Sequence, residues 1–338
     1  MRSPLTRPLA AIAAAALFVP VLTGCGSDAG DGDALVIYSG RNEKLVKPLL
    51  EKLEKAIGTE VDVRYGDSAE LAAQILEEGD KTKADLFFSQ DAGALGALSK
   101  DGLLAELPKG TLNKVDAAYR GSTGDWTGVS GRSRVIAYNP DRTDAAPDSV
   151  HDVVTSEWKG KVGYAPTNAS FQAFVTGMRV LEGDDATREW LKGLKEVGKP
   201  YDNNLRVLDA VESGEVTLGL INHYYWYERA AEKGADKLTA KLHFLPGGDA
   251  GALVNVAGAG VLKSSDQSGP ATEAVDFLLS KEAQHYFADE TKEYPLINGV
   301  SPSGGVPAMD TLQAPKIDLG ELDSLQETLA MLQAVGLV

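Results

Sequence analysis

The sequence has only one cysteine, Cys25, and far fewer basic than acidic residues. A single cysteine cannot form an intramolecular disulfide, which excludes a disulfide-stabilised scaffold. Lys and Arg total 33 against 49 Asp and Glu, and the formal net charge is -16. Because nucleic-acid binding requires clustered cations that replace counterions, this composition argues against a nucleic-acid partner.

The sequence also lacks the short motifs of common hydrolases and nucleotide-binding enzymes. It contains no Gly-x-Ser-x-Gly, no His-Glu-x-x-His, no Walker glycine loop and no candidate cysteine nucleophile. A hydrolytic carboxylate pair among the 49 acidic residues stays an open alternative, but nothing singles one out. We therefore expect a binding protein rather than an enzyme.

The only apolar stretch that approaches membrane-span length lies at the N-terminus, over residues 9–22. At about 14 residues it is too short for a comfortable span of a bilayer core, and it is typical of a signal peptide. The Leu-Thr-Gly-Cys sequence that follows resembles the bacterial lipobox, which predicts removal of residues 1–24 and lipidation of Cys25. Residues 25–33, rich in Gly and Asp, would form a tether. We expect an exported protein, periplasmic or lipid-anchored to the outer face of the cytoplasmic membrane.

The apolar pattern of the remaining chain alternates between strands and helices, and its length is sufficient to bury two cores. In the first third, strands are predicted over residues 34–38, 61–65 and 84–88, and helices over residues 43–57 and 68–76. This βαβαβ order indicates an α/β fold with a parallel sheet. Ligands are expected beyond the carboxyl ends of its strands.

The rest of the chain shows a second alternation of predicted strands and helices. Strands are predicted over residues 134–138 and 216–222, and residues 158–164 are predicted to contain a Lys-Gly-Lys turn that leads into another strand. A strand-like crossing segment is predicted over 251–262, and helices over 171–181, 186–197, 271–279, 281–288 and 319–333. The sequence therefore predicts an acidic α/β protein with two lobes.

A run of aromatic residues follows the predicted strand 216–222 and contains the adjacent tyrosines Tyr224 and Tyr225. A phenolate is a hard anionic ligand that suits Fe3+, although aromatic clusters are more often packing. Consecutive side chains on a strand point to opposite faces, so both phenols reach one ion only if the strand has ended and the chain turns. His223 would be a ligand or a hydrogen-bonding support of the pair, whereas Trp226 is expected to pack.

Several stretches together resemble the bacterial ferric-ion-binding proteins, which are solute-binding components of ABC importers. They stand in family order over most of the mature chain: Ile37-Tyr38-Ser39-Gly40, Leu76–Thr82, Ser130–Arg134, Trp158–Tyr164, Trp190–Lys195, Ala210–Val216, the tyrosine run, Gly251–Val254 and Glu293-Tyr294-Pro295-Leu296. The resemblance implies a two-lobe periplasmic solute-binding fold of type II, with parallel-type sheets joined by crossing strands. Lobe 1 would comprise residues 34–130 and about 256–305, and lobe 2 residues 131–255 and about 306–338.

The resemblance also implies a ligand set for Fe3+. Tyr224 and Tyr225 match the family's two metal-binding tyrosines, but its histidine position holds Asn42 and its glutamate position holds Gln90. Because amide oxygens are poorer ligands for a hard trivalent ion, a bound phosphate, carbonate or citrate would carry more of the coordination. Asp91 is a lesser candidate for the missing carboxylate.

The anion site is expected where the loop before residue 171 enters a helix, because the positive end of a helix dipole favours anions. Without the resemblance, these residues would be read as an ordinary capped helix. The expected anion-binding residues are Arg41, Asn168, Ala169, Ser170, Asn204 and Asn222.

The resemblance implies that the protein works as a monomer, attached to the membrane only by lipid, with an ABC permease and its ATPase. Two alternatives stay open within binding proteins. The same cleft would take another small solute, such as an anion, a polyol phosphate or a ferric chelate, or the protein would act mainly as an interaction partner with a decayed iron site.

Overall fold

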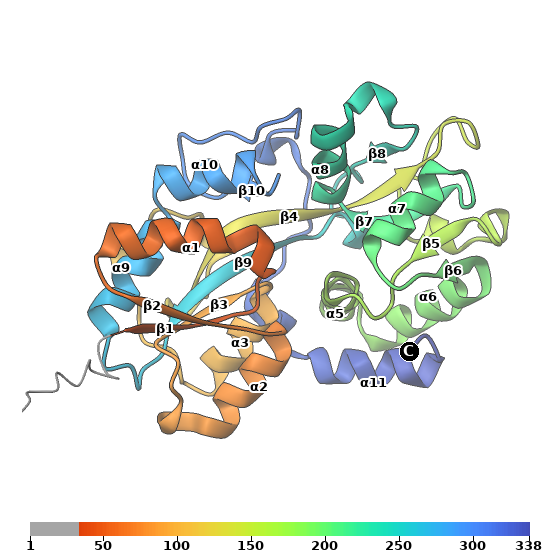
Figure 1. The fold of residues 1–338 in the computed structure, drawn as a ribbon. Coiled ribbons are helices and arrows are strands. Elements are labelled where there is room, and N and C mark those ends of the chain that lie inside the picture. The colour runs from red at the N-terminus through yellow and green to blue at the C-terminus, as the bar shows by residue number, and fades with distance from the viewer. Residues whose placement is uncertain (1–33) are drawn as a thin grey trace, which may run out of the picture. The chain divides into compact units, whose positions relative to one another are not determined.

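The computed structural model describes residues 34–338, and its first three strands form a parallel sheet in the order β2-β1-β3 (Figure 1). The predicted signal peptide 1–24, Cys25 and the tether 25–33 lie outside the described residues. The strands and helices of this part are β1 (Leu35–Ser39), α1 (Glu43–Ile57), β2 (Val61–Tyr65), α2 (Ser68–Glu78), β3 (Leu86–Ser89), α3 (Ala92–Lys100) and α4 (Lys109–Leu112).

A second parallel set of strands follows in the order β7-β5-β6. The elements of this part are β5 (Val162–Tyr164), α5 (Ala169–Glu182), α6 (Asp184–Val197), β6 (Gly198–Pro200), α7 (Asn204–Glu212), β7 (Leu218–Asn222), α8 (Tyr224–Lys233) and β8 (Lys241–His243). Helices α7 and α8 were not predicted from the sequence, whereas α5 and α6 begin two residues earlier than expected.

Two long antiparallel strands, β4 (Thr127–Tyr138) and β9 (Val254–Val261), join the parallel sets (Figure 1). The first half of β4 pairs with β9, and its second half, from Arg134 onward, pairs with β7. Strand β9 also pairs with β3, so the hydrogen-bonded order is continuous. The remaining elements are α9 (Ser268–Leu278), α10 (Lys281–Asp289), β10 (Tyr294–Pro295) and α11 (Leu325–Val335).

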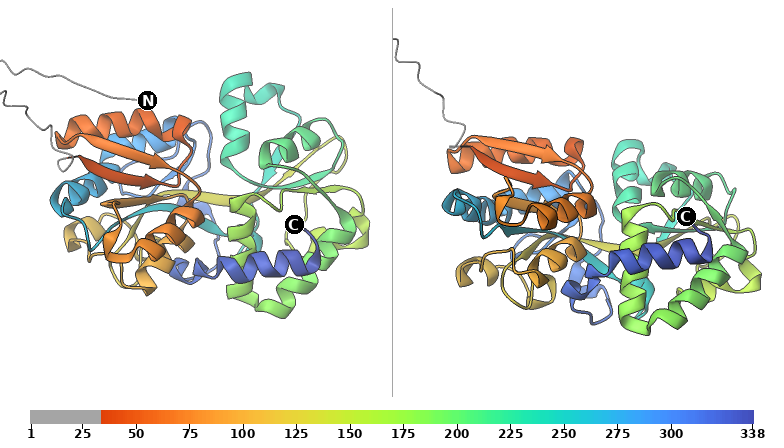
Figure 2. Two further views of the ribbon diagram at one scale, coloured as in Figure 1. Left: turned by 60° about the horizontal axis from the view of Figure 1, so that its bottom comes forward. Right: turned by 90° about the horizontal axis from the view of Figure 1, so that it is seen from below.

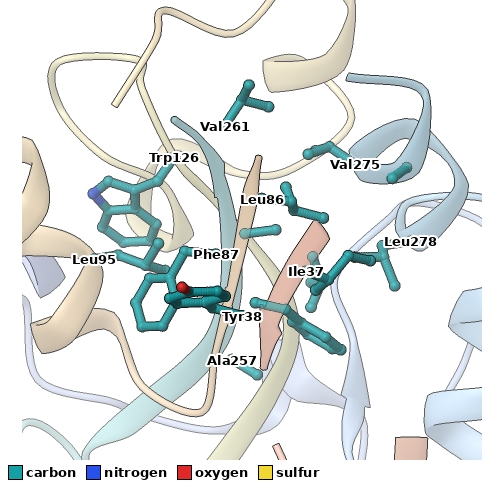
Figure 3. Close-up of a cluster of buried hydrophobic side chains, with 14 of the residues drawn as sticks. Ile37, Tyr38, Leu86, Phe87, Leu95, Trp126, Ala257, Val261, Val275 and Leu278 are labelled. Carbon is teal, nitrogen blue, oxygen red and sulfur yellow. The ribbon is translucent and has the colours of Figure 1, made fainter. Parts of the chain in front are cut away.

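Each parallel set has its own hydrophobic core. The first core gathers Ile37, Phe87 and Trp126 with apolar residues of α9, all fully or almost fully buried (Figure 3). The second core is built from α5, α6 and the strands β5 and β7, with residues such as Phe171 and Trp190. The predicted two-lobe α/β architecture, with parallel strands in each lobe and crossing strands between them, is confirmed.

The C-terminal segment departs from the expected lobe boundary, which placed all of residues 306–338 in lobe 2. Leu319 and Leu322 pack in the first core, and only residues from α11 pack in the second. The reason is a close approach to α3: a Cβ on Gly93 would lie 2.3 Å from the Leu322 carbonyl oxygen. The predicted helix 319–333 is correspondingly a 3-10 turn over Leu319–Asp323 followed by α11.

Helix α11 then lies against α5 (Figure 2). Thr328 of α11 and Thr176 of α5 are fully buried, and their hydroxyl oxygens are 2.8 Å apart. The segment therefore connects the two helices, α3 and α5, that begin at the cavity described below. Within residues 34–338, every helix is too short or too polar to span a bilayer.

Candidate metal and anion site

The two adjacent tyrosines lie on the first turn of a helix. Strand β7 ends at Asn222 and α8 begins at Tyr224, so the chain makes the turn that a shared site requires. The ring centroids of Tyr224 and Tyr225 are 4.2 Å apart, with Tyr224 buried and Tyr225 half-buried. Burial, followed by the neighbouring Tyr225, raises the pKa of Tyr224 well above 10.0.

His223 is fully buried directly before the pair, and both of its ring nitrogens have partners. Nδ1 accepts from the backbone N–H of Ser133 at 3.2 Å, and Nε2 donates to the carbonyl oxygen of Lys292 at 2.9 Å. Burial lowers the pKa of His223 to about 4, so the ring is neutral near pH 7. This arrangement suits the supporting role that the sequence allowed for His223, because neither nitrogen is free for a metal.

The start of α5 gathers several of the residues expected to bind an anion. Asn168 caps the helix: its Oδ1 accepts from the backbone N–H of Ser170 at 3.0 Å and from the Ser170 hydroxyl at 2.7 Å. Nδ2 of the fully buried Asn204 donates to the same Asn168 oxygen at 3.0 Å, and Oδ1 of Asn204 has no partner. Ala169 is the first residue of the helix.

Two buried arginines of β4 reach this region, and the sequence analysis gave neither a role. Arg134 donates from Nη1 to Asn222 Oδ1 at 3.1 Å and approaches the Ser170 hydroxyl at 3.5 Å. Burial lowers the pKa of Arg134 to about 10, although both tyrosines act in the opposite direction. Arg132 donates from Nη2 to the backbone oxygen of Gln90, and its Nε and Nη1 have no partner.

Arg41 and Gln90 belong to a buried network on the other side. Arg41 donates from Nη1 to Gln90 Oε1 at 2.9 Å and from Nη2 to Glu293 Oε2 at 2.8 Å. The Gln90 side chain is therefore held by a guanidinium. Asn42, at the other departure from the family pattern, is exposed and caps α1 by accepting from the backbone N–H of Lys44 at 3.0 Å.

A cavity of about 20 Å³ lies between these groups, with room for about one water molecule. Its walls come from both lobes: Gln90, Asp91, Arg132, Arg134, Ala169, Ser170, Ala173, Phe174, Asn222, Leu253 and Asn255. Asp91 caps α3 by accepting from the backbone N–H of Ala94 at 3.1 Å, and burial raises its pKa. The cavity thus joins the start of α3 to the start of α5, whereas Asn42 and the tyrosines lie outside its lining.

The oxygen and N–H groups of this region indicate which metal ions and anions it can bind. Among residues 34–338, no three His, Cys, Asp or Glu side chains lie close enough together to bind a metal ion. The phenol oxygens of Tyr224 and Tyr225 are the candidate metal donors in this region. The unpartnered N–H groups of Arg132 suit an anion, because buried donors without a partner carry a free-energy cost that a bound acceptor would remove.

Arg132, Arg134 and Glu293 belong to the site but were not predicted from the sequence. All three lie in stretches that resemble the ferric-binding family, which was the available signal. Arginines at alternate positions of a strand normally indicate a solvent-facing side. Here both are buried, and they line the cavity together with residues at the starts of α3 and α5.

Two α/β lobes joined by crossing strands, with a cavity walled by residues of both, define the class of extracytoplasmic two-lobe solute-binding proteins. The chain belongs to the family of bacterial extracellular solute-binding proteins, whose model matches residues 81–316. The major ferric iron-binding protein of Neisseria meningitidis serogroup B is 36% identical over 307 residues, which cover 90% of this chain and 93% of that protein.

Solved structures give the same result. Iron-bound HitA from Pseudomonas aeruginosa matches with a TM-score of 0.83 and 36% identity, over 90% of this chain and 99% of that chain. The Trichodesmium protein IdiA (FutA), solved in complex with iron and citrate ligands, matches with a TM-score of 0.76 and 26% identity, over 90% and 99% of the two chains. The predicted resemblance to ferric-binding proteins is confirmed.

Proposed function

We propose that this protein captures Fe3+ outside the cytoplasm and delivers it to an ABC importer. The observation that carries the proposal is the contact of Tyr224 with Tyr225 at the carboxyl end of β7, beside the guanidinium of Arg134. The relatives support it, because they are named as ferric iron-binding proteins. The capture and delivery of an ion require no covalent bond to be made or broken, which agrees with the lack of catalytic motifs. We therefore propose no enzymatic activity.

The two phenols would select Fe3+ over divalent cations. An ordinary tyrosine has a pKa of about 10, so metal binding at neutral pH must displace the phenol proton. Burial makes this displacement harder for Tyr224, whose pKa is raised further. A strongly polarising trivalent ion can offset that cost, whereas a weaker Lewis acid cannot.

An anion would complete the coordination and balance the arginines. We propose that phosphate, carbonate or citrate binds between the start of α5 and the guanidiniums of Arg132 and Arg134, with Asn204 and Asn222 nearby. Binding would require an opened cleft, because the cavity of about 20 Å³ has room for only about one water molecule. The N–H groups of Ala169 and Ser170 lie at the positive end of the helix dipole, which favours an anion. Arg41 would contribute positive charge from the other lobe, where it donates a hydrogen bond to the side chain of Gln90.

The remaining features of the proposal concern location and partners. We propose export by the signal peptide 1–24, lipidation at Cys25, and docking of a monomer on a permease whose ATPase is a separate protein. Lobe 1 would comprise residues 34–130 and about 256–305, joined by the 3-10 turn at Leu319–Asp323, and lobe 2 would comprise residues 131–255 and α11.

One observation favours a second candidate, the capture of a preformed ferric chelate or another anionic solute. Asn42 caps a helix and Gln90 is held by Arg41, so both are engaged at the two positions where this chain departs from the family pattern. Equilibrium dialysis of the purified protein against ferric nitrilotriacetate and against ferric citrate separates the two. We expect one iron per chain from either source; uptake from citrate alone would favour the chelate, and uptake from neither would exclude ferric capture.

A further inference from the structure

Glu293 holds the only ion pair among residues 34–338 in which both side chains are buried. It lies in the turn between α10 and β10, and its Oε2 accepts three hydrogen bonds. The donors are Arg41 Nη2 at 2.8 Å, the Ser130 hydroxyl at 2.7 Å and the Thr291 hydroxyl at 3.4 Å. Burial raises the pKa of Glu293, but the charges of Arg41 and Arg132 and the hydrogen bonds from Arg41 and Ser130 lower it overall, so the group carries a negative charge at neutral pH.

The cavity region contains more buried positive than negative charge. Arg41, Arg132 and Arg134 are each at most 5% exposed, and they are the only buried arginines or lysines in the described chain. The other buried acids lie elsewhere: Asp85 bonds to Ser265, and Asp125 bonds to Ser99 and Thr123. Glu293 is therefore the one fully buried carboxylate near the guanidiniums of Arg41 and Arg132, with the half-buried Asp91 capping α3.

The charge of Glu293 reaches the groups of the candidate site. It opposes the effect of burial on the pKa of Arg132 and adds to the causes that raise the pKa of Tyr224. Because charges in a buried environment interact much more strongly than charges in water, removing this carboxylate would change the potential at both positions. No other described carboxylate is both fully buried and paired with an arginine.

We propose that Glu293 determines the ligand selectivity of the cleft by cancelling one of its three buried guanidiniums, so that the cleft binds an anion together with Fe3+ rather than a free anion. The inference rests on the proposed ferric function. With Glu293 present, the three arginines and this carboxylate leave a net charge of +2. That charge is high enough to need an anion and low enough to admit a cation beside the phenols.

Four forms of the protein separate this role from a structural one. Glu293→Gln raises the net charge of these four positions to +3, and Arg41→Met lowers it to +1. The double variant Arg41→Met with Glu293→Gln returns it to +2. Ser130→Ala is the matched control, because it removes a 2.7 Å hydrogen bond from the same carboxylate oxygen without changing charge. Thermal unfolding checks that each form is folded.

The experiment measures inorganic phosphate and citrate binding to the metal-free proteins by calorimetry, and iron uptake from ferric nitrilotriacetate by dialysis. Glu293→Gln is expected to bind each free anion about tenfold more tightly and iron about tenfold more weakly than the wild type. Arg41→Met should change anion affinity in the opposite direction, and the double variant should lie between the two single variants. Ser130→Ala should stay close to the wild type.

Opposite shifts of anion and iron affinity are the decisive result, because a merely structural defect weakens both. Parallel losses in Glu293→Gln, or a double variant that fails to return toward wild type, overturn the selectivity role while ferric capture stands. If Glu293→Gln does not fold, the anion affinities of Arg41→Met and of the double variant are compared instead. The proposal requires Arg41→Met to bind anions about tenfold more weakly than the double variant, and equal affinities overturn it. A wild-type protein that takes up no iron overturns the proposed function and this inference together.

Discussion

The ring centroids of Tyr224 and Tyr225 lie 4.2 Å apart, because β7 ends two residues before Tyr224 and the helix α8 carries both rings on its first turn. On a continuing strand the two phenols would point to opposite faces. The neighbouring His223 anchors this turn through Ser133 of β4 and Lys292 of the turn before β10. The pair is thus held at the point where the two lobes meet.

Arg134→Met should weaken the binding of phosphate or citrate by about tenfold or more, since a buried charge next to the start of α5 would be lost. Iron uptake should then require a higher anion concentration. Calorimetry with each anion measures the first effect. Arg206→Met is the matched control, because the Arg206 side chain is 69% exposed; equal losses in both variants would contradict a specific role for Arg134.

Asn168→Ala should lower both stability and anion affinity. Loss of the α5 cap is expected to cost about 1 kcal/mol of unfolding free energy, and Asn204 Nδ2 also loses an acceptor. Asn203→Ala provides the comparison, because exposed Asn203 caps α7 by accepting from the backbone N–H of Arg206 at 3.0 Å. Chemical denaturation should show similar losses of stability, whereas only Asn168→Ala should lose anion binding.

Stability should fall on acidification through His223. Burial places its folded-state pKa at about 4, below the ordinary value near 6.5, so the unfolded chain binds the proton more readily. The contribution is present above about pH 6.5 and is lost as the pH falls toward 4, by up to about 3 kcal/mol. Urea denaturation between pH 4 and 7 measures it. In His223→Gln this part of the slope should be absent; an unchanged slope would show that other groups cause the acid sensitivity.

Gly93→Ala should destabilise the protein by about 1–3 kcal/mol, because the new methyl group would meet the Leu322 carbonyl oxygen at 2.3 Å. The 3-10 turn at Leu319–Asp323 would have to move away from α3. Gly110→Ala is the control, since nothing lies within 4 Å of its added Cβ. Equal melting temperatures for the two variants would contradict the tight packing of this turn on α3.

Much of the local secondary structure was predictable from the sequence. The four-residue spacing of apolar residues predicted α1 over Glu43–Ile57, and those bounds are the ones observed. The tyrosine pair was recognisable because both residues are adjacent and follow a buried strand. The helix α8 was not predicted, since an aromatic run after a strand has no strong helical period.

Long-range relationships were not readable in the same way. Arg41 and Glu293 are 252 residues apart in the chain, and nothing in either neighbourhood identifies the other as its partner. The burial of Arg132 and Arg134 depends on the starts of α3 and α5 lying beside them at the cavity, which is a tertiary property. The position of Leu319 and Leu322 in the first core likewise depends on the glycines of α3, whose role is visible only when the two segments meet.

The most direct test of ferric capture is the visible absorbance of the purified protein during titration with ferric citrate and with ferric nitrilotriacetate. A phenolate bound to Fe3+ gives an intense charge-transfer band, so the wild type should show a band that saturates at one iron per chain. Tyr224→Phe and Tyr225→Phe should each lose the band or strongly reduce it. Tyr119 packs against the first core, so Tyr119→Phe should keep the band. Absence of the band in the wild type with both iron sources would contradict the account.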